Sequence, residues 1–91
     1  MRMYIIERDI PEVGTFEREQ LREAAEKSNE VLRQLAPDIQ WQHSYVAGDK
    51  TFCVYLSTDE DVIRKHAEMS AFPATKITEI TGMIDPTTAK A

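Results

Sequence analysis

The stretch from Ile39 to Ser57, I-Q-W-Q-H-S-Y-V-A-G-D-K-T-F-C-V-Y-L-S, decides the fold that the sequence predicts. Its two halves are rich in β-branched and aromatic residues, which favour a pleated and half-buried surface. Between them lies Ala47-Gly48-Asp49-Lys50, where neighbouring glycine and aspartate supply the backbone freedom that a tight reversal requires. The stretch therefore predicts a β-hairpin.

A helical pattern precedes the hairpin and another follows it. From Leu21 to Leu35, small and apolar residues recur at spacings of three and four, which indicates one buried stripe, and Thr15 is the expected N-cap. After the hairpin, Ser57-Thr58 offers hydroxyls for the N-cap of a second helix, and Asp59-Glu60-Asp61 places acids in its first turn. Pro73 ends this second helix.

Short strands are expected at both ends of the chain, over Arg2–Arg8 and Thr75–Ile84. In the first strand, Tyr4, Ile6 and Arg8 share one face, which therefore ends in a cation, whereas the opposite face ends in the carboxylate of Glu7.

The element order is then β-α-β-β-α-β in one domain spanning residues 1–91, with about 87–91 as a frayed tail. This order predicts an α+β fold, a split β-α-β arrangement. Its four-stranded antiparallel sheet carries two helices on one face and leaves the other face open.

The register of the hairpin decides which side chains reach the open face. Phe52, Val54 and Leu56 are expected to face the helices. A loop of two or four residues pairs Tyr45 with Phe52, and a loop of three residues pairs it near Cys53. In the second register the open face carries Trp41, His43, Tyr45, Cys53 and Tyr55, which suits a dimer interface that encloses a pocket. The sequence leaves this choice open, because a slip of one residue exchanges the two faces.

Composition narrows the classes of protein. The net charge of −5 and the absence of a basic stripe argue against a nucleic-acid partner. No apolar run approaches the roughly 18 residues that a membrane span needs. The N-terminus lacks the pattern of a secretory signal, and a single cysteine cannot form an internal disulfide, so a cytoplasmic location is expected.

Several segments together resemble a family of short bacterial proteins of unknown function, labelled nickel-binding or nickel-responsive after one member. The resemblance runs from Met3 to about Thr88 and rests on I-I-E-R-D-I-P, W-Q-H-S-Y-V-A-G-D-K-T-F-C-V-Y, K-H-A-E-M-S-A-F-P-A-T-K-I-T-E-I and I-D-P-T. It implies a ferredoxin-like fold and a homodimer paired through the sheets, a dimeric α+β barrel. The chain departs from the family at Ser70-Ala71, where glycine more often precedes Phe-Pro.

Three residues are candidate metal ligands: His66, Cys53 and Glu7. Neutral imidazole and thiolate suit nickel. Each also has a structural alternative, as a hydrogen-bonded histidine between helix and sheet, a small buried hydrophobe, or a carboxylate paired with Lys50. His43 is more simply an exposed residue. No H-x-x-x-H, H-E-x-x-H or C-x-x-C motif is present, so a metal site would have to combine separate segments or two subunits.

A small-molecule site is the alternative. Trp41, Tyr45 and Tyr55, with Lys50 nearby, could line a pocket of aromatic bodies with polar tips, or could simply pack a dimer interface. There is no nucleophile elbow or phosphate loop, and a Cys53–His66 dyad would need the two side chains on one side of the sheet. The sequence therefore favours a binding protein over an enzyme and assigns no catalytic residue.

We thus expect a cytoplasmic homodimer that binds a divalent transition metal, nickel by resemblance, for buffering or sensing. The alternatives are a dimeric α+β-barrel protein or enzyme that binds a small molecule in an aromatic cleft on the open sheet face, with His66 as acid or base, and a structural module.

Overall fold

A computed structural model describes residues 1–90 of the chain. Its elements, in chain order, are the strand β1 (Arg2–Asp9), the 3-10 helix η1 (Val13–Thr15), the helix α1 (Arg18–Leu35), the strands β2 (Ile39–Ala47) and β3 (Lys50–Ser57), the helix α2 (Glu60–Ser70), the strand β4 (Lys76–Ile80) and the 3-10 helix η2 (Pro86–Lys90).

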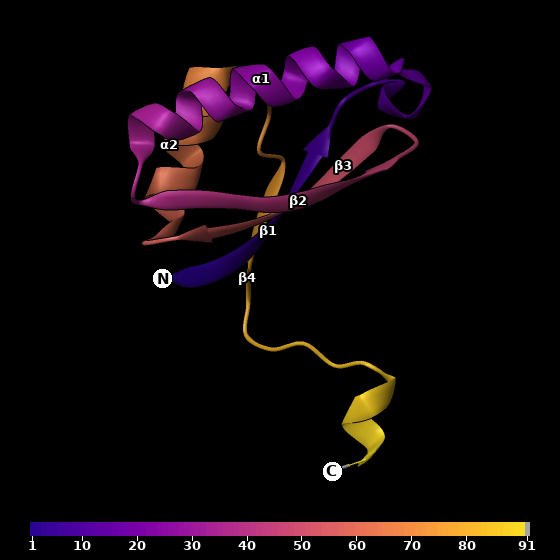
Figure 1. The fold of residues 1–91 in the computed structure, drawn as a ribbon, viewed down its shortest axis with the longest axis vertical. Helices are drawn as coiled ribbons and strands as arrows, with labels where there is room; N and C mark the ends of the chain where they lie inside the picture. The colour runs from indigo at the N-terminus through magenta and orange to yellow at the C-terminus, as the bar shows by residue number, and fades with distance from the viewer. Residues whose placement is uncertain (91) are drawn as a thin grey trace.

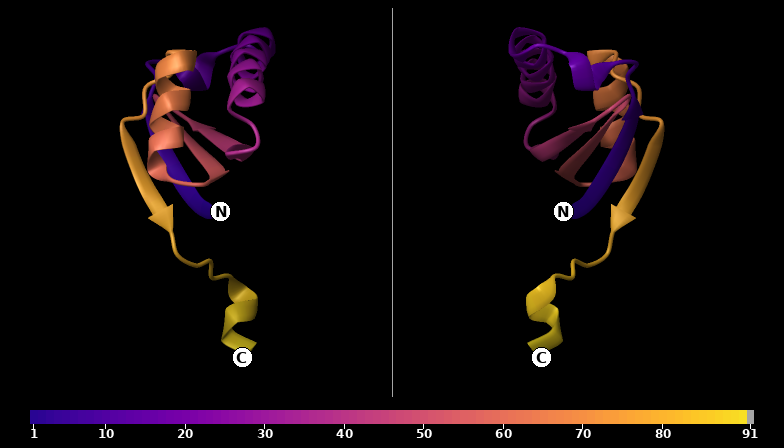
Figure 2. Two further views of the ribbon diagram at one scale, coloured as in Figure 1. Left: turned by 90° about the vertical axis from the view of Figure 1, so that its left-hand side faces the viewer. Right: turned by 90° about the vertical axis from the view of Figure 1, so that its right-hand side faces the viewer.

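The four strands form one antiparallel sheet in the order β2-β3-β1-β4. Both helices lie on the same side of this sheet and contact each other, as Figures 1 and 2 show. The split β-α-β arrangement predicted from the element order, the ferredoxin-like α+β fold, is therefore confirmed. The other side of the sheet has no helix on it.

The hairpin turns through Gly48-Asp49, with Ala47 paired to Lys50 and Tyr45 paired to Phe52. Gly48 has φ +62°, a conformation that favours glycine. The structure thus adopts the first of the two registers considered above.

The prediction that Phe52, Val54 and Leu56 face the helices is wrong. Their neighbours Cys53 and Tyr55 face the helices and are buried there. The reversal follows from the pairing with β1, which aligns Tyr4 with Tyr55 and Ile6 with Cys53 and so gathers these four on the helix side.

A bulge in β2 separates two aromatic side chains that simple alternation would place together. Trp41 pairs with Tyr55, but His43 pairs with Val54, so Gln42 is an extra residue on this strand. Trp41 consequently lies on the helix side, whereas His43 and Tyr45 lie on the opposite side. The predicted aromatic face of Trp41, His43, Tyr45, Cys53 and Tyr55 does not exist as one surface.

The face without helices is apolar at its centre. We call it the open face, and it carries Met3, Ile5, Glu7, His43, Tyr45, Phe52, Val54 and Leu56. Met3 and Tyr45 are exposed, and His43 and Tyr45 contact each other edge to face with ring centroids 5.2 Å apart.

The N-caps of both helices differ from the expected residues. The N-cap of α1 is Glu17 and not Thr15, because the Gln20 side chain accepts a hydrogen bond from the Glu17 backbone N–H at 2.8 Å and completes a capping box. In α2 the N-cap is Asp59 and not a hydroxyl residue, since Asp59 Oδ1 accepts a hydrogen bond from the Val62 N–H at 3.0 Å, and Glu60 and Asp61 are the acids of the first turn. The C-cap of α2 is Ala71, with φ +61°.

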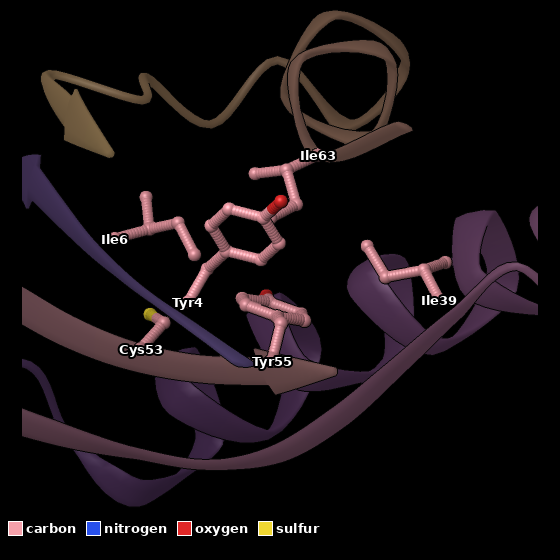
Figure 3. Packing of buried hydrophobic residues seen from close by; sticks show 6 residues of the cluster. All are labelled: Tyr4, Ile6, Ile39, Cys53, Tyr55 and Ile63. Carbon is pink, nitrogen blue, oxygen red and sulfur yellow. The ribbon is translucent and has the colours of Figure 1, made fainter. Parts of the chain in front are cut away.

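The core lies where β1 and β3, at the middle of the sheet, meet α2. Figure 3 shows Tyr4, Ile6, Cys53 and Tyr55 projecting from these strands toward Ile63 of α2, with Ile39 beside them. Ile6 and Ile63 are fully enclosed. This core holds α2 against the middle strands of the sheet.

The C-terminal region differs from the prediction in two ways. The last strand ends at Ile80, not at Ile84, and residues 86–90 form η2. The tail predicted for residues 87–91 thus contains helical turns, which stand away from the body of the fold (Figure 1), and its last residue, 91, lies outside the described residues.

Candidate functional site: a cavity between α1 and the sheet

A cavity of about 530 Å³ lies between α1 and the helix side of the sheet. Small side chains on both surfaces leave this space: Ala24, Ala25 and Ser28 on the helix, and Ser44 and Cys53 on the strands. Because such side chains cannot span the separation between helix and sheet, much of the predicted stripe of α1 is only half-buried, with Ser28 and Val31 the buried residues of this helix. We call this space the inner cavity.

Apolar residues of two loops also line the inner cavity. Val13 and Phe16 come from the segment between β1 and α1, and Phe72 and Pro73 come from the segment between α2 and β4. Lys27 of α1 lies over the Phe72 ring, with its Nζ 5.8 Å from the ring centroid. These residues surround a ligand-sized space with largely hydrocarbon walls.

The first of these loops is held by the hairpin turn. The Gly14 N–H donates to the Gly48 carbonyl at 2.7 Å, and the Glu12 N–H donates to Asp49 Oδ1 at 2.7 Å. A Cβ on Gly14 would lie 3.0 Å from the Gly48 carbonyl oxygen, so this close approach favours glycine. The turn that sets the hairpin register therefore also positions the cavity wall.

Arg8 places a buried cation in the inner cavity. Its side chain lines the cavity although the residue is only 3% exposed. Its Nη1 donates to the carbonyls of Phe72 at 3.2 Å and Pro73 at 3.1 Å, just beyond the C-terminus of α2, and its Nη2 donates to the Tyr55 hydroxyl at 3.4 Å. The partial negative charge at this helix end favours a cation.

Two aromatic residues complete the polar side of the inner cavity. The Trp41 Nε1–H donates to Ser44 Oγ at 2.9 Å, which fixes the indole against the cavity. Burial raises the pKa of Tyr55, although the nearby Arg8 acts in the opposite direction. Tyr55 therefore keeps its proton at neutral pH and remains a hydrogen-bond donor.

His66 of α2 is fully buried next to this site. Its Nε2 lies 3.1 Å from Ser28 Oγ, and its ring centroid lies 5.5 Å from that of Tyr55. Burial, reinforced by the charge of Arg8, lowers the pKa of His66 to about 4, so the imidazole is neutral near pH 7. Its Nδ1 is the one enclosed side-chain nitrogen or oxygen without a hydrogen-bond partner among residues 1–90.

The three predicted metal ligands do not meet in one chain. Cys53 and His66 lie on the helix side of the sheet, whereas Glu7 lies on the open face. Cys53 Sγ contacts Thr51 Oγ1 at 3.5 Å. No group of three or more His, Cys, Asp and Glu residues that could hold a metal ion occurs within residues 1–90, so a nickel ion does not fit one protomer alone.

The predicted small-molecule residues separate into two groups. Trp41 and Tyr55 line the inner cavity, together with Cys53. Tyr45 is 61% exposed on the open face. Lys50 Nζ lies 2.8 Å from Asp9 Oδ1 and 3.9 Å from Glu7 Oε1, which is the structural ion pair considered for Glu7.

The sequence pattern had not identified Arg8 or Ser28 as site residues. A signal for Arg8 was present, because it shares a strand face with Tyr4 and Ile6, and both of these are buried. Ser28 fell within the apolar stripe of α1, and only the contact with His66 shows that it has a polar partner.

Comparison with known proteins places this fold in a family. A family model described as "Nickel responsive protein SCO4226-like" matches residues 4–80. The crystal structure of SCO4226 from Streptomyces coelicolor A3(2) superimposes with a TM-score of 0.74 over 90% of this chain and 99% of that chain, at 13% sequence identity. No curated protein sequence matches in a direct comparison. Within residues 1–90, no helix is long and apolar enough to cross a membrane.

Proposed function

This chain belongs to the SCO4226-like family of nickel-responsive proteins, and we propose that it is a homodimeric cytoplasmic protein that binds a small organic molecule in the inner cavity. The observation that carries this proposal is the cavity itself. Its volume of about 530 Å³ lies within the range of roughly 300–1,000 Å³ that is usual for ligand sites. Its walls are mostly apolar, with a few polar groups gathered around Arg8 and Tyr55.

This proposal moves the small-molecule site from the open face, where the sequence had suggested it, to the helix side. No catalytic step is proposed. Ser28 Oγ lies 3.1 Å from Nε2 of the neutral His66, but no third side chain orients this imidazole, because its Nδ1 has no hydrogen-bond partner among residues 1–90.

The test uses Trp41, the only tryptophan of the chain and a wall of the cavity, as an internal reporter. Short-chain organic molecules, both charged and neutral, are titrated while the tryptophan emission is followed. We expect a saturable change in the wild-type protein that weakens at least about tenfold in Ala25→Leu, which fills the cavity. Glu30→Leu, which adds the same side chain on the exposed side of α1, serves as the matched control.

A saturable response that Ala25→Leu and Glu30→Leu change equally would contradict binding in the inner cavity. The absence of any saturable response to every probe would contradict the proposed function as a whole.

The second candidate function is a response to nickel, which the family description supports. Because residues 1–90 of one chain bring together no three such ligands, the ion would be shared by two chains. Glu7 and His43 lie on the open face, where a second copy would bring the same side chains again. A carboxylate and an imidazole are suitable ligands for nickel.

Calorimetric titration of tag-free protein with nickel tests this candidate. We expect one nickel ion to bind per two chains. This binding should be lost in His43→Ala and in Glu7→Gln, and it should be kept in His66→Asn. Loss in His66→Asn alone would instead place the ion in the interior, and the absence of heat would contradict nickel binding by this chain.

The homodimer itself is supported by the open face. Its apolar side chains, including the exposed Met3 and the half-buried Phe52 and Leu56, have no helix of residues 1–90 over them, and a second copy would remove them from water. Two further apolar residues, Met83 and Ile84, are 85% and 83% exposed on the segment that leads away from the body. They offer additional contacts to a partner.

A further inference from the structure

We propose that the ligand of the inner cavity is an organic anion, a carboxylate with an apolar body, whose charge is held by Arg8. This inference depends on the proposed function, because it specifies the class of molecule that the cavity binds. It rests on the juxtaposition of a buried guanidinium and a ligand-sized apolar space.

The charge of Arg8 has no counter-ion among the residues that the structure describes. Among residues 1–90, no carboxylate oxygen lies within 4.0 Å of its guanidinium. Asp9 is the one acid in the cavity lining, and its Oδ1 accepts a hydrogen bond from Lys50 Nζ at 2.8 Å. The carbonyls of Phe72 and Pro73 provide dipoles, not a full negative charge. A buried cation without an anion is costly, so an anionic ligand here would offset that cost.

The guanidinium also keeps a donor available. Its hydrogen bonds to residues 1–90 come from Nη1 and Nη2, and none comes from Nε. Because His66 Nδ1 is the single enclosed atom without a partner in this part of the chain, Arg8 Nε is not fully enclosed. A guanidinium N–H without a protein partner can donate to a carboxylate, which pairs well with the planar guanidinium.

The other polar groups nearby are also suited to an anion. The Tyr55 hydroxyl accepts a hydrogen bond from Arg8 Nη2 and so retains its own proton for donation. Thr51, buried and on the cavity wall, supplies a second hydroxyl. Beyond these groups the walls are mostly hydrocarbon, contributed by residues such as Val13, Leu21 and Phe72. A ligand with a charged head against Arg8 and an apolar body along α1 would match the polar and the apolar parts of the cavity.

The test compares hexanoate with hexanamide, and benzoate with benzamide, at neutral pH and constant ionic strength. The members of each pair have similar size, so the comparison isolates the charge. Binding is measured by Trp41 emission and by calorimetry. We expect each carboxylate to bind at least about tenfold more tightly than its amide, since a charge-assisted hydrogen bond is worth more than a neutral one.

Two variants locate the effect. Arg8→Met is expected to abolish the preference for the carboxylate while the amide still binds. Arg8→Lys keeps the charge but loses the fork of donors, and is expected to bind the carboxylate more weakly than wild type. Arg33→Met, the same change at an exposed arginine of α1 outside the cavity lining, is the control for a general loss of positive charge.

The outcomes separate the two proposals. Equal binding of carboxylate and amide by the wild-type protein would overturn the anion inference and leave the cavity as a neutral site. This comparison needs no variant, so it decides the question even if Arg8→Met fails to fold. Failure of all four compounds to change Trp41 emission or release heat would overturn both the anion inference and the proposed function.

Discussion

Trp41 and His43 point to opposite sides of the sheet although they are two residues apart in β2. The bulge at Gln42 is responsible, because it pairs Trp41 with Tyr55 and His43 with Val54. One residue thus directs the indole into the inner cavity and the imidazole to the open face. The small-molecule proposal and the dimer proposal concern the two sides that this bulge separates.

The hydrogen bond from Trp41 Nε1 to Ser44 Oγ, 2.9 Å long, should hold the indole in place. We expect Ser44→Ala to lower the free energy of unfolding by about 1 kcal/mol, because a half-buried donor loses its partner. The tryptophan emission should change at the same time. Ser44→Thr keeps a hydroxyl and is the control. Denaturant unfolding followed by tryptophan emission measures the stability and the emission of each variant. Equal stability of Ser44→Ala and wild type would show that water replaces the hydrogen bond.

The buried His66 should make stability depend on pH. Its pKa is about 4 in the folded chain, whereas the unfolded chain has the usual value of 6.5. The unfolded state therefore takes up a proton first, and stability present above pH 6.5 is lost as the pH falls toward about 4. The difference corresponds to about 3 kcal/mol.

Unfolding of metal-free wild-type protein and of His66→Gln, measured from neutral pH down to about pH 4, checks this prediction. The carboxylates titrate in both proteins, so the difference between the two curves reports His66. The stability advantage of the wild type should shrink as the pH falls. Parallel curves would mean that His66 takes up its proton equally in the folded and unfolded states.

Ala71 should be a site of stabilisation. It occupies the C-cap of α2 with φ +61°, a left-handed conformation that costs a residue with a Cβ about 1 kcal/mol. Ala71→Gly should therefore raise stability by up to about 1 kcal/mol, despite the greater freedom of glycine in the unfolded chain. The control is Ala67→Gly in the interior of the same helix, which should lower stability by about 1 kcal/mol. Thermal unfolding measures the stability of both variants. An equal loss of stability in Ala71→Gly and Ala67→Gly would contradict this prediction.

The open face should carry the dimer contact. Phe52→Glu places a charge in the apolar centre of this face, and we expect it to convert a dimer into a monomer by light scattering after size-exclusion chromatography. Gln34→Glu, on the exposed side of α1, should leave the dimer intact. A monomeric wild-type protein, or a dimer that Phe52→Glu does not affect, would contradict the assignment of this face.

Local sequence features determined the order of elements and most of their ends. The pattern of β-branched and aromatic residues gave the hairpin, Gly48-Asp49 gave its turn, and Asp59 gave the start of α2, because each depends on contacts a few residues apart. The same information selected Trp41, Tyr55 and Cys53 as residues of interest, and all three line the inner cavity.

Only the tertiary structure decided which face each strand residue occupies and where a cavity forms. Strand alternation has a period of two, so it separates Cys53 and Tyr55 from Phe52 and Val54 but does not say which pair meets the helices. The bulge at Gln42 breaks even that alternation. The inner cavity and the missing counter-ion of Arg8 depend on distances between segments far apart in the chain, which a pattern of neighbouring residues does not contain.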